Sequence, residues 1–72
     1  MNQQDRILRH LKDHGSITSM DAIYEYGATR LSAQIFSLRK KGHEIVTRTE
    51  HAKNRYGEPT KYARYLYING PE

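Results

Sequence analysis

Residues 27–42 read GATRLSAQIFSLRKKG, and this stretch decides the fold of the chain. Its apolar residues recur at i, i+4 and i+7, which makes one stripe along a helix: Leu31, Ile35 and Leu38. Thr29 is a favourable N-cap, and the basic residues 39–41 suit the C-terminal end of a helix dipole. The stretch therefore predicts a helix over residues 30–41 that ends at Gly42.

An earlier helix is expected over residues 3–14, with Asn2 as its N-cap and Gly15 as its stop. Its apolar residues share one side: Ile7, Leu8 and Leu11. His10 and His14 lie four residues apart on it, a spacing that can hold a metal ion. No third ligand and no catalytic glutamate accompanies them in the sequence, so we expect no metal site.

A second, short helix is expected over residues 20–26, with Ser19 as its N-cap and Gly27 as its stop. Its expected apolar face consists of Met20, Ile23 and Tyr24. Of Tyr24 and Tyr26, we expect one to be buried and the other exposed. The segment before it, residues 16–18, forms either one short edge strand or an extended linker. A short helix, a tight glycine-containing turn and a second helix make a helix-turn-helix unit.

After Gly42 the pattern changes from helix to strand. Residues 45–49 and 62–68 are rich in β-branched and aromatic side chains, and the polar segment 51–61 between them contains glycine and proline. This order predicts an antiparallel hairpin, whose tyrosines pack on the core and its rim: Tyr62, Tyr65 and Tyr67. The fold class is therefore α+β, with three helices, a hairpin and room for a short third strand.

Length and composition exclude several classes of protein. Seventy-two residues allow one domain, over residues 1–72, with an expected ordered core of about residues 3–68. The absence of cysteine excludes a disulfide scaffold and a thiol nucleophile, and the sequence has no glycine-rich phosphate loop and no nucleophile elbow. We therefore expect no enzyme, no catalytic residues and no cofactor. No apolar run is long enough to span a membrane and no secretory signal is seen, so a soluble, cytoplasmic chain is expected.

Positive charge is concentrated in the second half of the chain. Residues 30–64 hold nine basic and three acidic groups, a net of +6, although the whole chain carries only +4. A basic half on a small domain is typical of a polyanion binder, and a solvated basic surface is the plainer alternative.

Two sets of residues are candidates for contacts with double-stranded DNA. On the outer face and flanks of the third helix, small and polar side chains can approach and read base edges. This first set is Thr29, Arg30, Ser32, Ala33, Gln34, Ser37 and Lys40. On the hairpin, basic and polar groups can hold phosphates. This second set is Arg48, Lys53, Asn54, Arg55 and Lys61.

Residues 27–45 resemble the recognition-helix stretch of small winged helix-turn-helix proteins of phages and prophages. Those proteins often carry a Gly-x-x-Arg-Leu-(Ser/Ala)-Ala-x-Ile-x-x-Leu-Arg-x-x-Gly run, followed by an isoleucine in the first wing strand. Residues 54–57 and 63–65 resemble the tip and returning strand of the family's wing. The resemblance covers about residues 3–68, and it implies a winged-helix fold and a DNA-binding regulator of a phage or mobile element.

Other readings stay open at this point. Phe36 lies on the outer face of the third helix, where we expect it to cover the sheet or a neighbouring helix rather than contact a base. A winged helix can also serve as a protein-interaction module, for example a phage inhibitor of a host protein. An excisionase-like protein that bends DNA is a third possibility. A homodimer on DNA is compatible with each DNA-binding reading, because a single winged helix covers little DNA.

Overall fold

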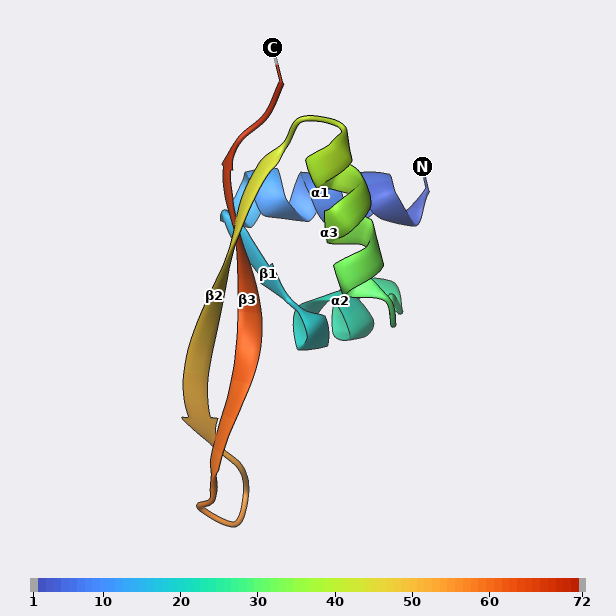
Figure 1. The fold of residues 1–72 in the computed structure, drawn as a ribbon. Helices are drawn as coiled ribbons and strands as arrows, with labels where there is room; N and C mark the ends of the chain where they lie inside the picture. The colour runs from blue at the N-terminus through green and yellow to red at the C-terminus, as the bar shows by residue number, and fades with distance from the viewer. Residues whose placement is uncertain (1, 72) are drawn as a thin grey trace.

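The computed structural model describes residues 2–71. The chain forms three helices and three strands in this order: α1 (Gln3–His14), β1 (Ser16–Thr18), α2 (Ser19–Tyr26), α3 (Leu31–Lys40), β2 (Glu44–Lys53) and β3 (Pro59–Asn69). The helices gather around the upper part of a narrow sheet, and the hairpin of β2 and β3 extends far beyond them (Figure 1). We call the part of this hairpin from residue 47 to residue 65 the wing.

The sheet has the strand order β1-β3-β2 and is antiparallel throughout. Ile17 lies opposite Tyr65, and Thr47 lies opposite the same tyrosine on the other side. The short segment 16–18 is therefore the edge strand that the sequence allowed. The α+β fold class predicted from the sequence is confirmed.

The core lies between the three helices and the upper end of the sheet. Nine apolar residues are buried in it: Ile7, Leu11, Ile17, Ala22, Ala28, Leu31, Ile35, Leu38 and Ile45. The stripe of α3 predicted from the sequence is buried as a whole. Tyr65 and Tyr67 pack against this core and are partly buried, as predicted. The prediction is wrong for Tyr62, which is exposed because it lies on the other face of β3.

Two predicted helix caps are wrong. The N-cap of α2 is Thr18 rather than Ser19: its hydroxyl accepts a hydrogen bond from Asp21 N, and its own N–H donates to the Asp21 carboxylate, each over 3.1 Å. This reciprocal capping box needs partners three positions apart in the sequence, as Thr18 and Asp21 are. The N-cap position of α3 is Arg30 rather than Thr29, and no side chain caps it. The caps Asn2 and Gly15 of α1 are confirmed.

The predicted apolar face of α2 is also wrong. Met20 and Tyr24 are 69% and 87% exposed, and Ile23 is exposed as well. The helix instead turns Ala22 into the core, because a small side chain lets a short helix lie close to its neighbours. Tyr26 is partly buried and its phenol lies 2.8 Å from His10 Nδ1, so one of the two tyrosines on α2 is indeed buried and one exposed.

Phe36 does not cover the sheet or a neighbouring helix. Its side chain is 60% exposed, because it lies more than 100° around α3 from the middle of the buried stripe. The strands are also longer than predicted: β2 continues to Lys53 and β3 begins at Pro59, which leaves residues 54–58 for the tip.

Candidate nucleic-acid interface

Apart from Phe36, the outer face of α3 consists of small and polar side chains. Five members of the first candidate set are exposed on it or at its start: Thr29, Arg30, Ser32, Ala33 and Lys40. The helix axis can therefore approach a surface closely at Ser32 and Ala33. Arg30 and Lys40 lie near its two ends and provide positive charge there.

Gln34 and Ser37 lie on the flank of α3 that faces α1, and both are only half-exposed. The Gln34 side-chain oxygen accepts a hydrogen bond from Gln4 Nε2 of α1 over 3.3 Å. Lys41 Nζ donates to the oxygen of the same Gln4. This flank therefore ties α3 to α1 and leaves the outer face as the free surface.

Arg39 fixes the geometry between α3 and the wing. Its Nε and one terminal nitrogen donate to the carbonyl oxygen of Ile45 over 2.9 and 2.6 Å, and that terminal nitrogen also donates to Thr47 Oγ1 over 2.8 Å. This role is not predictable from the sequence, because a basic residue in the last turn of a helix is already explained by the helix dipole. The Arg39 side chain therefore fixes the position at which β2 extends from the helical body.

Arg48 lies on the sheet face opposite to Thr47, because neighbouring residues of a strand point to opposite faces. One of its terminal nitrogens contacts Glu50 Oε2 at 3.0 Å. Arg64 Nε contacts the other Glu50 oxygen at 2.8 Å, and Arg64 Nη1 donates to Ser16 Oγ over 3.1 Å. The hydrogen bond from Arg64 lowers the pKa of Glu50 to about 2, with further contributions from Tyr62 and Arg48. Arg48 therefore shares the Glu50 carboxylate with Arg64 and lies on the face of the sheet that points away from α3.

Asn54 organises the tip of the wing. Its side-chain oxygen accepts hydrogen bonds from Tyr56 N and Glu58 N over 2.9 and 3.1 Å, and its amide nitrogen donates to Glu58 Oε1. Gly57 adopts φ 77° in this turn, a backbone conformation that favours glycine. Asn54 therefore lies inside the turn and stabilises it, and its neighbours Lys53 and Arg55 are exposed to solvent.

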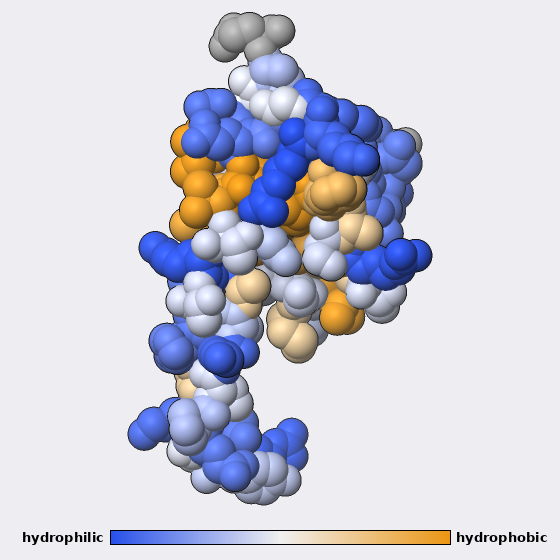
Figure 2. Space-filling model, in the orientation of Figure 1, coloured by the Kyte–Doolittle hydropathy of each residue, from blue (hydrophilic) through white to orange (hydrophobic). Residues whose placement is uncertain are grey.

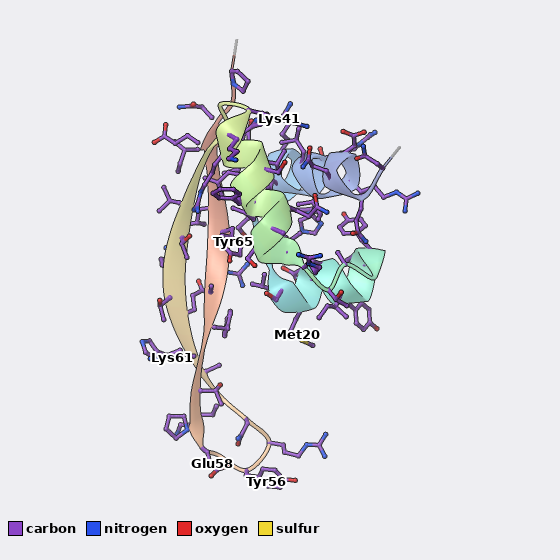
Figure 3. All side chains as sticks on the ribbon, turned by 45° about the vertical axis from the view of Figure 1, so that its right-hand side comes forward. Met20, Lys41, Tyr56, Glu58, Lys61 and Tyr65 are labelled. Atoms are coloured by element: carbon purple, nitrogen blue, oxygen red, sulfur yellow. The ribbon has the colours of Figure 1, made fainter. Side chains whose placement is uncertain are left out.

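The remaining cations of the wing are free within the described chain. Lys53, Arg55 and Lys61 are exposed, and none of the three forms an ion pair with another residue of 2–71. Tyr56 and Glu58 mark the far end of the wing in Figure 3, where Lys61 extends away from the helices. The front face of the wing is blue to white along almost its whole length, whereas orange gathers on the upper part of the molecule, over the upper end of the sheet and the helices (Figure 2). The structure therefore presents a polar, basic arm that extends beyond the helices (Figure 1).

The part of the chain that the structure describes has no pocket and no group of three or more side chains that could hold a metal ion. His10, from the pair on α1, is engaged with Tyr26. None of the helices described has the length and apolar character needed to cross a membrane.

A scan against protein families matches residues 2–69 to the winged helix-turn-helix domain. The chain belongs to this family. The match covers all three helices and the three strands, so the helix-turn-helix unit is α2, the turn and α3, and the hairpin is the family's wing. A winged helix-turn-helix domain is a DNA-binding module and is typically not an enzyme. A search of the curated proteins and a search of the solved structures each found no match.

Proposed function

We propose that this winged helix-turn-helix chain binds double-stranded DNA sequence-specifically and without catalysis, with α3 in the major groove and the wing on phosphates. One observation carries the proposal: a wing with free cations extends beyond the helical body (Figure 1), whose α3 exposes a face that is small and polar apart from Phe36. Phosphates supply the counter-charge that the wing cations lack within residues 2–71. The small side chains permit the close approach that base reading requires.

Within the proposal, the exposed residues of α3 differ in role. Arg30 can donate two hydrogen bonds to a guanine edge, Ser32 has a hydroxyl for either type of base, and Ala33 fits against a thymine methyl group. Thr29 and Lys40, near the two ends of this face, reach phosphates. Gln34 and Ser37, on the half-exposed flank toward α1, contact DNA only at the edge of the groove.

On the wing, Lys53, Arg55 and Lys61 are the phosphate-binding groups of the proposal. Arg48 supplies long-range positive charge from the opposite face, and Asn54 holds the tip in shape. The resemblance to small phage and prophage proteins extends the proposal to a transcriptional regulator of a mobile element that acts in the cytoplasm of a bacterial host. Two copies on adjacent half-sites would supply the contact area that one small domain lacks.

The first test is fluorescence anisotropy of a random 30-base-pair duplex with the full chain at two salt concentrations. We expect an affinity that falls steeply with salt, because bound cations on DNA are released when wing residues replace them. A binding site is then selected from a random library. No binding at low salt would refute the proposal.

Arg30→Ala and Lys53→Ala separate the two halves of the proposed interface. Arg30→Ala should relax the sequence preference at one position, at a cost of about 1–3 kcal/mol for the preferred site. Lys53→Ala should weaken binding to all sequences alike and lower the salt slope by about 0.9. Equal binding of every sequence by the unmodified chain would contradict specific reading and would favour a DNA-bending role.

A second candidate function, binding of a partner protein such as a host factor, is favoured by the exposed apolar side of α2. Met20, Ile23 and Tyr24 lie on it, and Met20 points away from the body in Figure 3. This candidate predicts an interaction that Tyr24→Glu abolishes and that Lys53→Ala leaves unchanged. The DNA-binding proposal predicts the reverse for DNA affinity.

A further inference from the structure

The only phenylalanine of the chain is exposed on the DNA-facing side of α3. Phe36 is 60% exposed and is not one of the buried core residues. An exposed phenyl ring costs free energy in water, and it has no group that could bond to water or to a phosphate. Its place on α3 is therefore not explained by the fold.

The neighbours of Phe36 make its ring the dominant apolar group of this face. One turn earlier on the helix lie Ser32 and Ala33, which are much smaller, so the ring stands out beyond them. One turn later, Lys40 Nζ lies 4.7 Å from the centroid of the ring. The ammonium group covers one side of the ring by a cation–π contact and leaves the rest of the ring free.

We propose that Phe36 recognises the 5-methyl group of a thymine in the major groove, an inference that rests on the proposed DNA binding. A phenyl ring can discriminate only by apolar contact, since it neither donates nor accepts hydrogen bonds. Thymine is the only base that presents an apolar group at the floor of the major groove. A cytosine at the same position carries hydrogen in place of the 5-methyl group, so the ring would lose this apolar contact.

Lys40 gives this recognition a second element. Its ammonium group, held beside the ring, is positioned to reach a phosphate next to the thymine when the ring enters the groove. Ring and ammonium thus form one unit that pairs an apolar base contact with a backbone contact. The nearby Arg39 does not take part, because its guanidinium is bound to the Ile45 carbonyl and Thr47.

The chemistry around Phe36 favours DNA over a protein partner at this position. The ring is a single apolar group on a face of small, polar and basic side chains. The contiguous apolar side chains that a protein interface requires lie instead on α2.

The experiment uses the full chain and the duplex selected from the random library. Each thymine of that duplex is replaced singly by deoxyuridine, which removes the methyl group and leaves every hydrogen-bonding group in place. At one or two positions, we expect the unmodified chain to bind the deoxyuridine duplex about fourfold more weakly, the effect of losing one buried methyl group. At the other thymines no change is expected.

Phe36→Ala should bind the thymine and deoxyuridine duplexes equally at those positions. Phe36→Leu keeps an apolar side chain and should retain part of the difference. Tyr24→Ala is the matched control, because it removes an exposed aromatic ring from α2 and should keep the full fourfold difference. Thermal unfolding followed by circular dichroism checks that each variant is folded.

The outcomes separate this inference from the function on which it rests. If the chain binds no DNA, both are refuted. If it binds a selected site whose thymines can all be replaced by deoxyuridine without loss, only the thymine reading is refuted, and this result needs no variant. A deoxyuridine effect that survives in Phe36→Ala would assign the methyl contact to another residue, Ala33 first, and would also refute the inference.

Discussion

The helical body and the wing are held together by different forces. All nine buried apolar residues belong to the body or to the upper end of the sheet, whereas no residue from Val46 to Tyr62 is buried. The body therefore owes its stability to the removal of apolar surface from water. The wing relies on the ladder of β2 and β3, the turn around Asn54 and the Arg48–Glu50–Arg64 cluster. Stability and DNA contact should accordingly be separable by mutation.

Packing of its base on the body explains how a long hairpin without a core of its own can stay folded. An isolated hairpin is only marginally stable in water. Here its base is part of the core, through Ile45 on β2 and Tyr65 and Tyr67 on β3. In Figure 3, Tyr65 lies where the upper sheet faces α3. The body thus holds one end of the wing and leaves the other end free to follow a phosphate backbone.

The largest effect is expected from Ile35→Ala in the body. Ile35 is 1% exposed in the middle of α3, and removal of its side chain leaves a cavity that costs about 2–5 kcal/mol. For a domain of this size that is a large part of the total stability. Urea unfolding followed by circular dichroism measures the loss. Ser32→Ala, on the exposed side of the same helix, is the control and should change stability by less than about 0.5 kcal/mol. Equal losses of unfolding free energy in Ile35→Ala and Ser32→Ala would contradict the burial of Ile35 and the exposure of Ser32.

A smaller effect is expected from Arg39→Ala, which acts on the joint between the two regions. The substitution leaves the Ile45 carbonyl without its charged donor and should cost about 1.5–3 kcal/mol. It also frees the angle of the wing relative to α3, so affinity for a selected site should fall more than affinity for random DNA. Unfolding curves and anisotropy on both duplexes measure the two effects.

Arg39→Lys is the matched control for this joint. Lysine keeps the positive charge but cannot place two donors on one carbonyl and a third on Thr47. If Arg39→Lys behaved like the unmodified chain in both measurements, charge alone would explain the role of Arg39, and the fixed angle of the wing would be disproved.

Sequence reasoning predicted those parts of the molecule that a regular pattern determines. The stripe of Leu31, Ile35 and Leu38 fixed α3 and the side it buries, and Asn2 and Gly15 fixed the ends of α1. The order of helices, turn and hairpin then predicted a helix-turn-helix unit in an α+β fold, and the family resemblance implied the winged fold. Each of these conclusions depends on local spacing, which the sequence contains directly.

The parts that were missed depend on contacts between distant residues. Large apolar side chains on α2 indicated its buried face, but packing against the rest of the body selected the smaller Ala22. The strands of the wing were predicted too short, because polar residues in a free hairpin give no alternation to recognise. Partners such as Gln4 with Gln34, or Glu50 with Arg64, lie 30 and 14 residues apart and follow only from the folded chain.

The smallest effect on stability is expected from a change in pH, and the body and the wing should respond at different pH values. His43 lies in the body beside Tyr67, and burial, together with the charges of Lys12 and Lys41, lowers the pKa of His43 below 6.5. The unfolded chain therefore takes up this proton before the folded chain does, so the stability of the body should decrease as pH falls through the range just below 6.5. Thermal unfolding at pH 7.5 and pH 5.5 measures the change, and His43→Gln should reduce it.

The wing should respond only at much lower pH. Because the folded-state pKa of Glu50 is about 2, its ion pairs are fully present above the ordinary pKa of 4.5 and are lost as pH falls from there toward 2. At pH 5.5 the Glu50 carboxylate should therefore still hold Arg64 and Arg48 while His43 already weakens the body. A carboxylate titration of Glu50 by NMR with a midpoint near 4.5 would contradict the ion pairs, and with them the account of how the wing keeps its shape without a core.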